Sequence, residues 1–128
     1  SQIGSIEFAA DLYHTRLVVV MGHTMCGAVI ATLEQLERPT ANRSPNLRPI
    51  VARIEPAVES LLDTDLRHDR DRLLSHAIRA NTRAAANQVR HGSQILENLI
   101  QNDGLIVVAA EYSLETGVVD FFFFFPGS

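Results

Sequence analysis

The segment LVVVMGHTMCG, residues 17–27, decides the fold of this 128-residue chain. Its first five residues form an unbroken, valine-rich apolar run that ends at Gly22. Such a run is typical of a strand that is covered on both faces, as in a parallel sheet. His23 and Cys26 follow, and residues 28–36 have the composition of a helix. We therefore expect a strand, a short loop and a helix, with both side chains at the sheet edge where α/β folds place their sites.

Helical and extended patterns alternate along the rest of the chain. Ser5 and Ser93 are expected N-caps, Glu7 should lie in a first helical turn, and Pro56 should kink or restart a helix. The further expected elements are helices at about 5–14, 50–62, 71–90 and 93–103, a loop at 37–49, a buried strand at 105–109, a turn at 115–117 and a hairpin strand at about 118–122. This order predicts an α/β fold with a mostly parallel central sheet flanked by helices, formed as a single domain by residues 1–128.

The composition indicates a soluble globular protein, because 46% of the residues are apolar, 20% are charged and the formal net charge is −4. Mild acidity argues against nucleic acid as a partner, since binding phosphates requires clustered lysines and arginines. No apolar run approaches the roughly 18 residues of a membrane span, and no signal peptide is evident. The only cysteine excludes an internal disulfide and suits a reducing compartment. We expect a cytoplasmic protein.

Five of the six phenylalanines form one run at residues 121–125. A strand made of this run is apolar on both faces, so apolar alternation does not explain it. An exposed strand of this kind promotes aggregation. We expect a partner subunit to cover it.

The His23-x-x-Cys26 spacing places two zinc-type donors in one loop, because zinc prefers imidazole nitrogen and thiolate sulfur. Gly22 and Gly27 flank these donors and are the expected supporting residues of the loop. Two donors do not complete a site, since even a catalytic zinc normally holds three protein groups. The other histidines are expected at the surface rather than as ligands; they are His14, His68, His76 and His91.

Two alternatives remain open for this pair of residues. Cys26 can be an ordinary buried cysteine and His23 an ordinary loop histidine, without any metal. Cys26 can also be a nucleophile with His23 as its base. We rank the nucleophile below zinc, because no phosphate-cradling loop follows Cys26 and no orienting acid is evident nearby.

Longer stretches of the sequence resemble the β-class carbonic anhydrases. GSIEFAA at residues 4–10 resembles the helix that leads into the family's "G-H-x-x-C-G" strand and loop, which is matched by residues 17–29. Residues 87–96 resemble the family's late helices, and VVAAEYSLETGVV at residues 107–119 resembles its closing hairpin. The resemblance covers nearly the whole chain in the same order.

This resemblance implies that His23 and Cys26 are two protein ligands of a catalytic Zn²⁺ ion. It also implies reversible hydration of carbon dioxide to bicarbonate by a homo-oligomer, either a dimer or a multiple of dimers. The family's first ligand cysteine lies in a "C-x-D-S-R" motif, whose Asp and Arg orient the water on zinc. That motif is absent from this sequence. We therefore expect a truncated domain that lacks the first strands and contains no catalytic residue.

Three functional hypotheses follow. The chain is the C-terminal portion of a zinc carbonic anhydrase and is inactive alone, or it is a non-catalytic module for assembly or anion binding, or it is a plain structural fragment. In the family the missing first strand lies beside the strand at 17–21. We expect that edge to be covered by a second copy or by the missing segment, and a monodisperse monomer at high concentration would contradict this.

Overall fold

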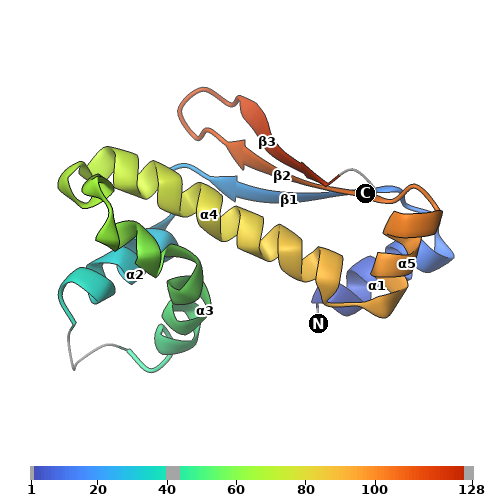
Figure 1. The fold of residues 1–128 in the computed structure, drawn as a ribbon, viewed down its shortest axis with the longest axis horizontal. Helices are drawn as coiled ribbons and strands as arrows, with labels where there is room; N and C mark the ends of the chain where they lie inside the picture. Colours follow the sequence, from blue (N-terminus) through green and yellow to red (C-terminus); the bar gives the residue numbers. More distant parts are fainter. Residues whose placement is uncertain (1, 40–43, 126–128) are drawn as a thin grey trace.

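A computed structural model describes residues 2–39 and 44–125, and it shows helices gathered under one small sheet (Figure 1). Its elements are α1 (Gln2–Leu12), β1 (Leu17–His23), α2 (Gly27–Glu37), α3 (Arg48–Val58), the 3₁₀ turns η1 (Glu59–Asp63) and η2 (Asp65–His68), α4 (Arg70–His91), α5 (Gln94–Asn102), β2 (Ile106–Tyr112) and β3 (Val119–Phe125). The predicted α/β fold and element order are confirmed. The predicted loop at 37–49 is shorter than expected, because α2 extends to Glu37 and α3 begins at Arg48; its residues 40–43 lie outside the described part.

The sheet has the order β1-β2-β3 within the described residues. β1 and β2 are parallel, with Leu17 beside Ile106 and His23 beside Tyr112. β2 and β3 are antiparallel, as the predicted hairpin requires. The carboxyl ends of β1 and β2 therefore lie together, and the loop that follows β1 starts at that edge.

α4 is the element that joins the two parts of the core, and it runs under the sheet in Figure 1. Its first half packs Leu73 and Ala77 into a cluster with α2 and α3. Its second half packs Ala86 and Val89 into a cluster with α1, α5 and the strands. A single helix thus fixes the position of the sheet relative to both groups of helices.

Within the described part of this chain, β1 is covered on one face only, whereas cover on both faces was expected. Its exposure alternates along the strand, and Leu17 and Met21 on the outer face are 55% and 50% exposed. Figure 1 shows the helices on one side of the sheet. An apolar run indicates that a strand can be buried on both faces, but it does not show which chain covers each face, and the described residues of this chain cover only one.

Pro56 neither starts a new helix nor ends α3 at its own position. The residue lies inside α3, two residues before the helix ends at Val58, and the chain then tightens into η1. The expected disturbance is therefore found just after Pro56, where α-helix changes to 3₁₀ geometry.

The N-cap prediction was right for α5 and wrong for α1. The Ser93 hydroxyl accepts a hydrogen bond from Leu96 N at 3.3 Å, as an N-cap does. α1 begins at Gln2, so Ser5 lies within the helix and Glu7 is beyond its first turn. Instead, the Glu7 carboxylate accepts a hydrogen bond from the Ser93 hydroxyl. Glu7 thus joins α1 to the start of α5.

Replacing Ser93 by Ala is expected to lower the free energy of unfolding by about 1–2 kcal/mol. The change removes the cap of α5 and the donor to Glu7 together. Ser93→Thr keeps the hydroxyl and serves as the control. Urea denaturation measures both variants, and a loss below about 0.5 kcal/mol for Ser93→Ala contradicts the capping role.

A β-bulge divides the phenylalanine run between the two faces of the sheet. Ala109 pairs with Phe123, but its neighbour Ala110 pairs with Phe121, so the register shifts between them. Phe122 and Phe123 pack against the core on the helix-covered side. Phe121 and Phe124 are exposed, 47% and 58% respectively. The run therefore needs cover on one face only, and the cover by a partner subunit stays a prediction.

Candidate metal-binding loop and its surroundings

His23 is the last residue of β1, and its ring is exposed. Its Nδ1 lies 2.8 Å from the carbonyl oxygen of Thr24. A carbonyl only accepts hydrogen bonds, so Nδ1 must carry the hydrogen in this contact. The neutral ring then has its free lone pair on Nε2, which is the form that binds a metal.

Cys26 is the N-cap of α2, with an extended backbone conformation. Its carbonyl oxygen accepts the first helical hydrogen bond, from Ile30 N at 3.0 Å. The thiol is half-buried, forms no disulfide and makes no capping hydrogen bond. The structure thus places His23 and Cys26 at the two ends of one short loop, as the sequence predicts.

The two glycines beside this loop have different surroundings. A Cβ on Gly22 would lie 2.3 Å from Thr82 Oγ1 on α4, so β1 approaches α4 too closely for any side chain at this position. A Cβ on Gly27 would meet no atom within 4 Å. Gly22 therefore has a clear packing role under the loop, whereas Gly27 has none of this kind.

Met25 occupies the left-handed region of the backbone, with φ of 56°. A non-glycine residue there costs roughly 1–2 kcal/mol, and Asn tolerates it better than Met. Met25→Asn is therefore expected to raise the free energy of unfolding by about 1 kcal/mol. Met25→Leu, which has no such preference, should leave it unchanged, and equal stability of the two variants in urea denaturation would contradict the strain.

The donors of the loop fit zinc in chemical type but not in number. His23 offers Nε2 and Cys26 offers sulfur, both preferred zinc ligands. Across residues 2–39 and 44–125, no group of three or more His, Cys, Asp or Glu side chains is placed to hold a metal ion. The other four histidines are exposed, and His91 forms an ion pair with Glu97 at 3.1 Å when protonated. The loop is thus a partial donor set.

A second cluster of charges, which the sequence analysis missed, lies on the helix-covered side of the same sheet. Arg79 on α4 donates from Nε to the buried Glu111 at 2.9 Å and from Nη2 to Asp120 at 2.7 Å. Its guanidinium also lies 4.7 Å from the ring centre of Phe122. Glu111 is the register partner of Gly22, so this cluster stands one residue from the end of β1. The signal in the sequence was a carboxylate inside an otherwise apolar strand.

The guanidinium of Arg79 is charged at every pH at which proteins are handled. Partial burial lowers its pKa, but the hydrogen bonds and charges of Asp120 and Glu111 outweigh this effect and raise the pKa above its usual value. Arg79 therefore neutralises Glu111 permanently and ties α4 to β2 and β3. This Arg–carboxylate group is engaged within the fold and is not the Asp-Ser-Arg motif of the family, which is absent from this sequence.

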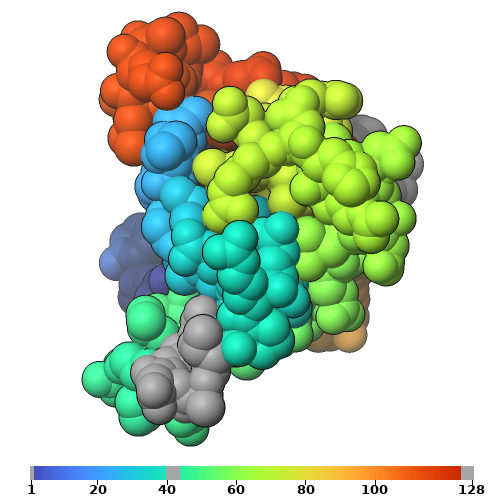
Figure 2. All heavy atoms as spheres, turned by 90° about the vertical axis from the view of Figure 1, so that its left-hand side faces the viewer, coloured from blue at the N-terminus to red at the C-terminus, as the bar shows by residue number. Residues whose placement is uncertain are grey.

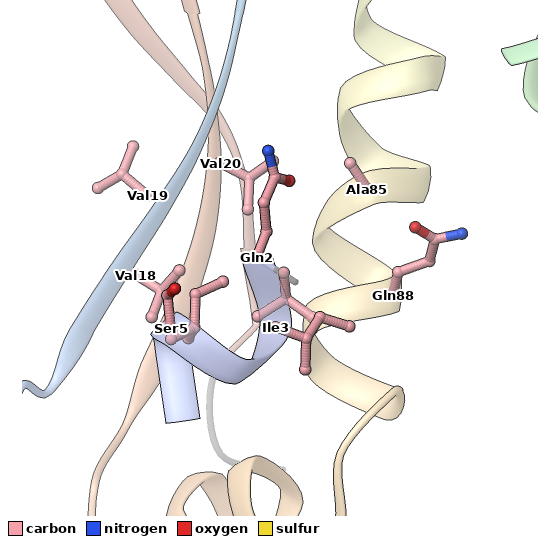
Figure 3. Close-up of a pocket in the computed structure, with 10 residues that line it drawn as sticks. Gln2, Ile3, Ser5, Val18, Val19, Val20, Ala85 and Gln88 are labelled. Atoms are coloured by element: carbon pink, nitrogen blue, oxygen red, sulfur yellow. The ribbon is translucent and has the colours of Figure 1, made fainter. Parts of the chain in front are cut away.

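An apolar cleft of about 470 Å³ lies between α1, β1 and α4 (Figure 3). Ile3 comes from α1, Val18 and Val20 from β1, and Gln88 from α4. Neither His23 nor Cys26 is among its lining residues. The cleft is therefore separate from the candidate loop and lies on the side of β1 that faces α1 and α4.

Comparison with known proteins identifies the family. Residues 1–119 match the family model described as carbonic anhydrase. The chain belongs to the β-carbonic anhydrase family. Among its relatives, the carbonic anhydrase of Mycolicibacterium smegmatis is 43% identical over 56 residues, which is 44% of this chain and 27% of that protein. Carbonic anhydrase 2 of Mycobacterium tuberculosis is 39% identical over 56 residues, covering the same shares of the two chains.

Solved structures of β-carbonic anhydrases share the fold. The β-carbonic anhydrase CafA of Aspergillus fumigatus superposes with a TM-score of 0.79 at 23% identity, over 93% of this chain and 54% of that chain. The Coccomyxa β-carbonic anhydrase, solved with acetazolamide, gives a TM-score of 0.77 at 18% identity, over 93% and 52%. This β-carbonic anhydrase chain thus spans about half the length of these solved relatives. The family resemblance and the fold expected from it are confirmed.

Proposed function

We propose that this chain supplies half of the zinc site of a carbonic anhydrase that interconverts carbon dioxide and bicarbonate. The observation that carries the proposal is the loop in which His23 directs Nδ1 to Thr24 and keeps Nε2 as a donor, with Cys26 three residues later. Family membership supports the same assignment. A third donor and the water-orienting groups must then come from outside the described residues.

In this proposal, His23 Nε2 and the Cys26 thiolate would hold the ion. When bound, zinc supplies Lewis-acid activation of water for attack on carbon dioxide near neutral pH. The chain's own contribution is orientation: Thr24 fixes the His23 ring, and α2 fixes the backbone of Cys26. The lone pair on His23 Nε2 stays accessible to a metal ion because the residue is exposed. We propose that the 128-residue chain alone is inactive.

The test is a zinc titration of the purified chain, combined with stopped-flow carbon dioxide hydration on the same samples. The wild-type chain is expected to bind one Zn²⁺ weakly, and His23→Ala and Cys26→Ser should each weaken binding by about tenfold or more. His76→Ala is the matched control, since His76 is an exposed histidine on α4. Hydration should stay at the background rate in every sample.

Two results would contradict this proposal. If the His23 and Cys26 variants bind zinc like the wild type, the loop is not the metal site. If the wild-type chain binds zinc stoichiometrically and hydrates carbon dioxide, the site is complete, with ligands from a partner copy or from groups not yet assigned.

A second role, in assembly, is supported by the outer face of the sheet. β1 is an edge strand within the described residues, and its outer face continues over β2 and β3 through exposed apolar side chains. They are Leu17, Val19, Met21, Ile106, Phe121 and Phe124. We propose that another chain or segment covers this face, as in a homo-oligomer. Light scattering across a concentration series tests this, and a monomer throughout contradicts it.

None of the described helices has the length and apolarity needed to cross a membrane. Separately, we propose a cytoplasmic location, which a single free cysteine suits because that compartment is reducing. Fluorescent tagging of the chain in cells tests the location directly.

A further inference from the structure

Thr24 fastens the candidate loop to a part of the chain 90 residues away. Its backbone N–H donates to the carbonyl oxygen of Tyr112 at 3.0 Å. Its hydroxyl oxygen accepts a hydrogen bond from Leu114 N, also at 3.0 Å. Figure 2 shows the atoms of the β2–β3 connection (orange) directly against those of the segment after β1 (blue). The loop is therefore attached to the hairpin through both the backbone and the side chain of one residue.

The same residue also receives the hydrogen bond of the His23 ring. Its carbonyl oxygen lies 2.8 Å from His23 Nδ1. A contact of this kind fixes both the tautomer and the rotation of a histidine, and metal-binding histidines commonly use it. Because all three polar groups of Thr24 are engaged, its carbonyl is held in one direction relative to the sheet.

The hairpin to which Thr24 is attached is itself held in place. Arg79 binds Glu111 and Asp120, which are the second-last residue of β2 and the second residue of β3. Ser113 N donates to Val118 O at 2.9 Å and closes the connection. The loop is thus fastened to a rigid support rather than to a free turn.

We propose that Thr24 is a positioning residue for the His23–Cys26 loop, and that its hydroxyl couples the β2–β3 connection to the tautomer of His23. The inference rests on the proposed function insofar as His23 is a metal ligand. It extends that function by assigning a role to a side chain that is not one of the two proposed zinc ligands. Without the hydroxyl, the Leu114 bond is lost and the Thr24 carbonyl is free to turn from the ring.

Three variants separate this role from general stability. Thr24→Val removes the hydroxyl with little change in shape, and Thr24→Ser keeps it. Thr116→Val is the matched control, because Thr116 Oγ1 accepts from Val118 N at 3.2 Å in the same connection. That control loses an equivalent hydroxyl–amide bond without a contact to the loop.

The first readout is the ¹⁵N NMR spectrum of the His23 ring at alkaline pH. The Nδ1–H form should dominate in the wild type, Thr24→Ser and Thr116→Val, and Thr24→Val should gain a substantial Nε2–H fraction. The second readout is a Zn²⁺ titration, in which only Thr24→Val should bind about tenfold more weakly. An unchanged tautomer in Thr24→Val, with zinc affinity within twofold of the wild type, overturns the inference.

The two proposals fail in different ways. If no sample binds Zn²⁺, the proposed function is wrong, and the tautomer comparison still decides whether Thr24 positions His23. If the wild type binds Zn²⁺ and Thr24→Val keeps both the wild-type tautomer and the wild-type zinc affinity, the function stands and the role of Thr24 is refuted.

Discussion

Arg79→Met is expected to lower the free energy of unfolding by about 3 kcal/mol, because it leaves a buried carboxylate without its partner. Glu111 is buried, and Arg79 lies 2.9 Å from its Oε1. Methionine fills much of the space of the arginine stem but provides no charge and no donor. Urea or guanidinium denaturation measures the loss, and two-state behaviour should be checked with two probes.

A double variant distinguishes the buried charge from lost packing. Arg79→Met combined with Glu111→Gln removes the unpaired charge and should recover more than about 1 kcal/mol of the loss. Asp120→Asn is the control at the more exposed end of the cluster and should cost less than about 1 kcal/mol. If Arg79→Met and Asp120→Asn cost the same, the burial of Glu111 is not the dominant effect.

Gly22→Ala is expected to cost about 2 kcal/mol, because the new methyl group would overlap the hydroxyl of Thr82. That hydroxyl is buried and donates to Ile78 O at 2.8 Å, so it cannot move away freely. Gly27→Ala is the matched control at the start of α2. It meets no atom and should be neutral or stabilising by about 0.5 kcal/mol, since alanine favours helix.

The overlap can be tested by removing the atom that causes it. In the double variant Gly22→Ala/Thr82→Ala, the loss should be smaller than the sum of the two single losses by about 1 kcal/mol. Strict additivity, measured by denaturation of all four chains, would show that the close approach of β1 to α4 is not what requires glycine at this position.

The sequence predicted the order of elements and the loop because their signals are local. Eleven residues contain the valine-rich run, the glycine and the His-x-x-Cys spacing that predict the strand and the loop. Ser93 likewise lies directly before the helix that it caps. The first residue of a helix was predicted less reliably, since α1 begins three residues before the expected cap at Ser5. The family followed from motif order over nearly the whole chain, and residues 1–119 match it.

The remaining features depend on contacts between distant residues and could not be predicted. Arg79 meets Glu111 and Asp120 only because α4 crosses the sheet, and no spacing in the sequence links these three residues. The role of Thr24 depends on a partner at position 114. The division of the phenylalanine run likewise required the bulge, which a run of identical residues does not reveal.

The parallel pairing of β1 with β2 also has a consequence for folding. Leu17 pairs with Ile106, so closing this pair requires a contact across about 90 residues, whereas β2 and β3 close locally. Contacts at long sequence separation form slowly. At about 5–20 residues per second, a ribosome releases β1 roughly 5–20 s before its partner strand. During that interval β1 is an unpaired apolar strand, so chaperone binding should concentrate on residues 17–21 of the nascent chain.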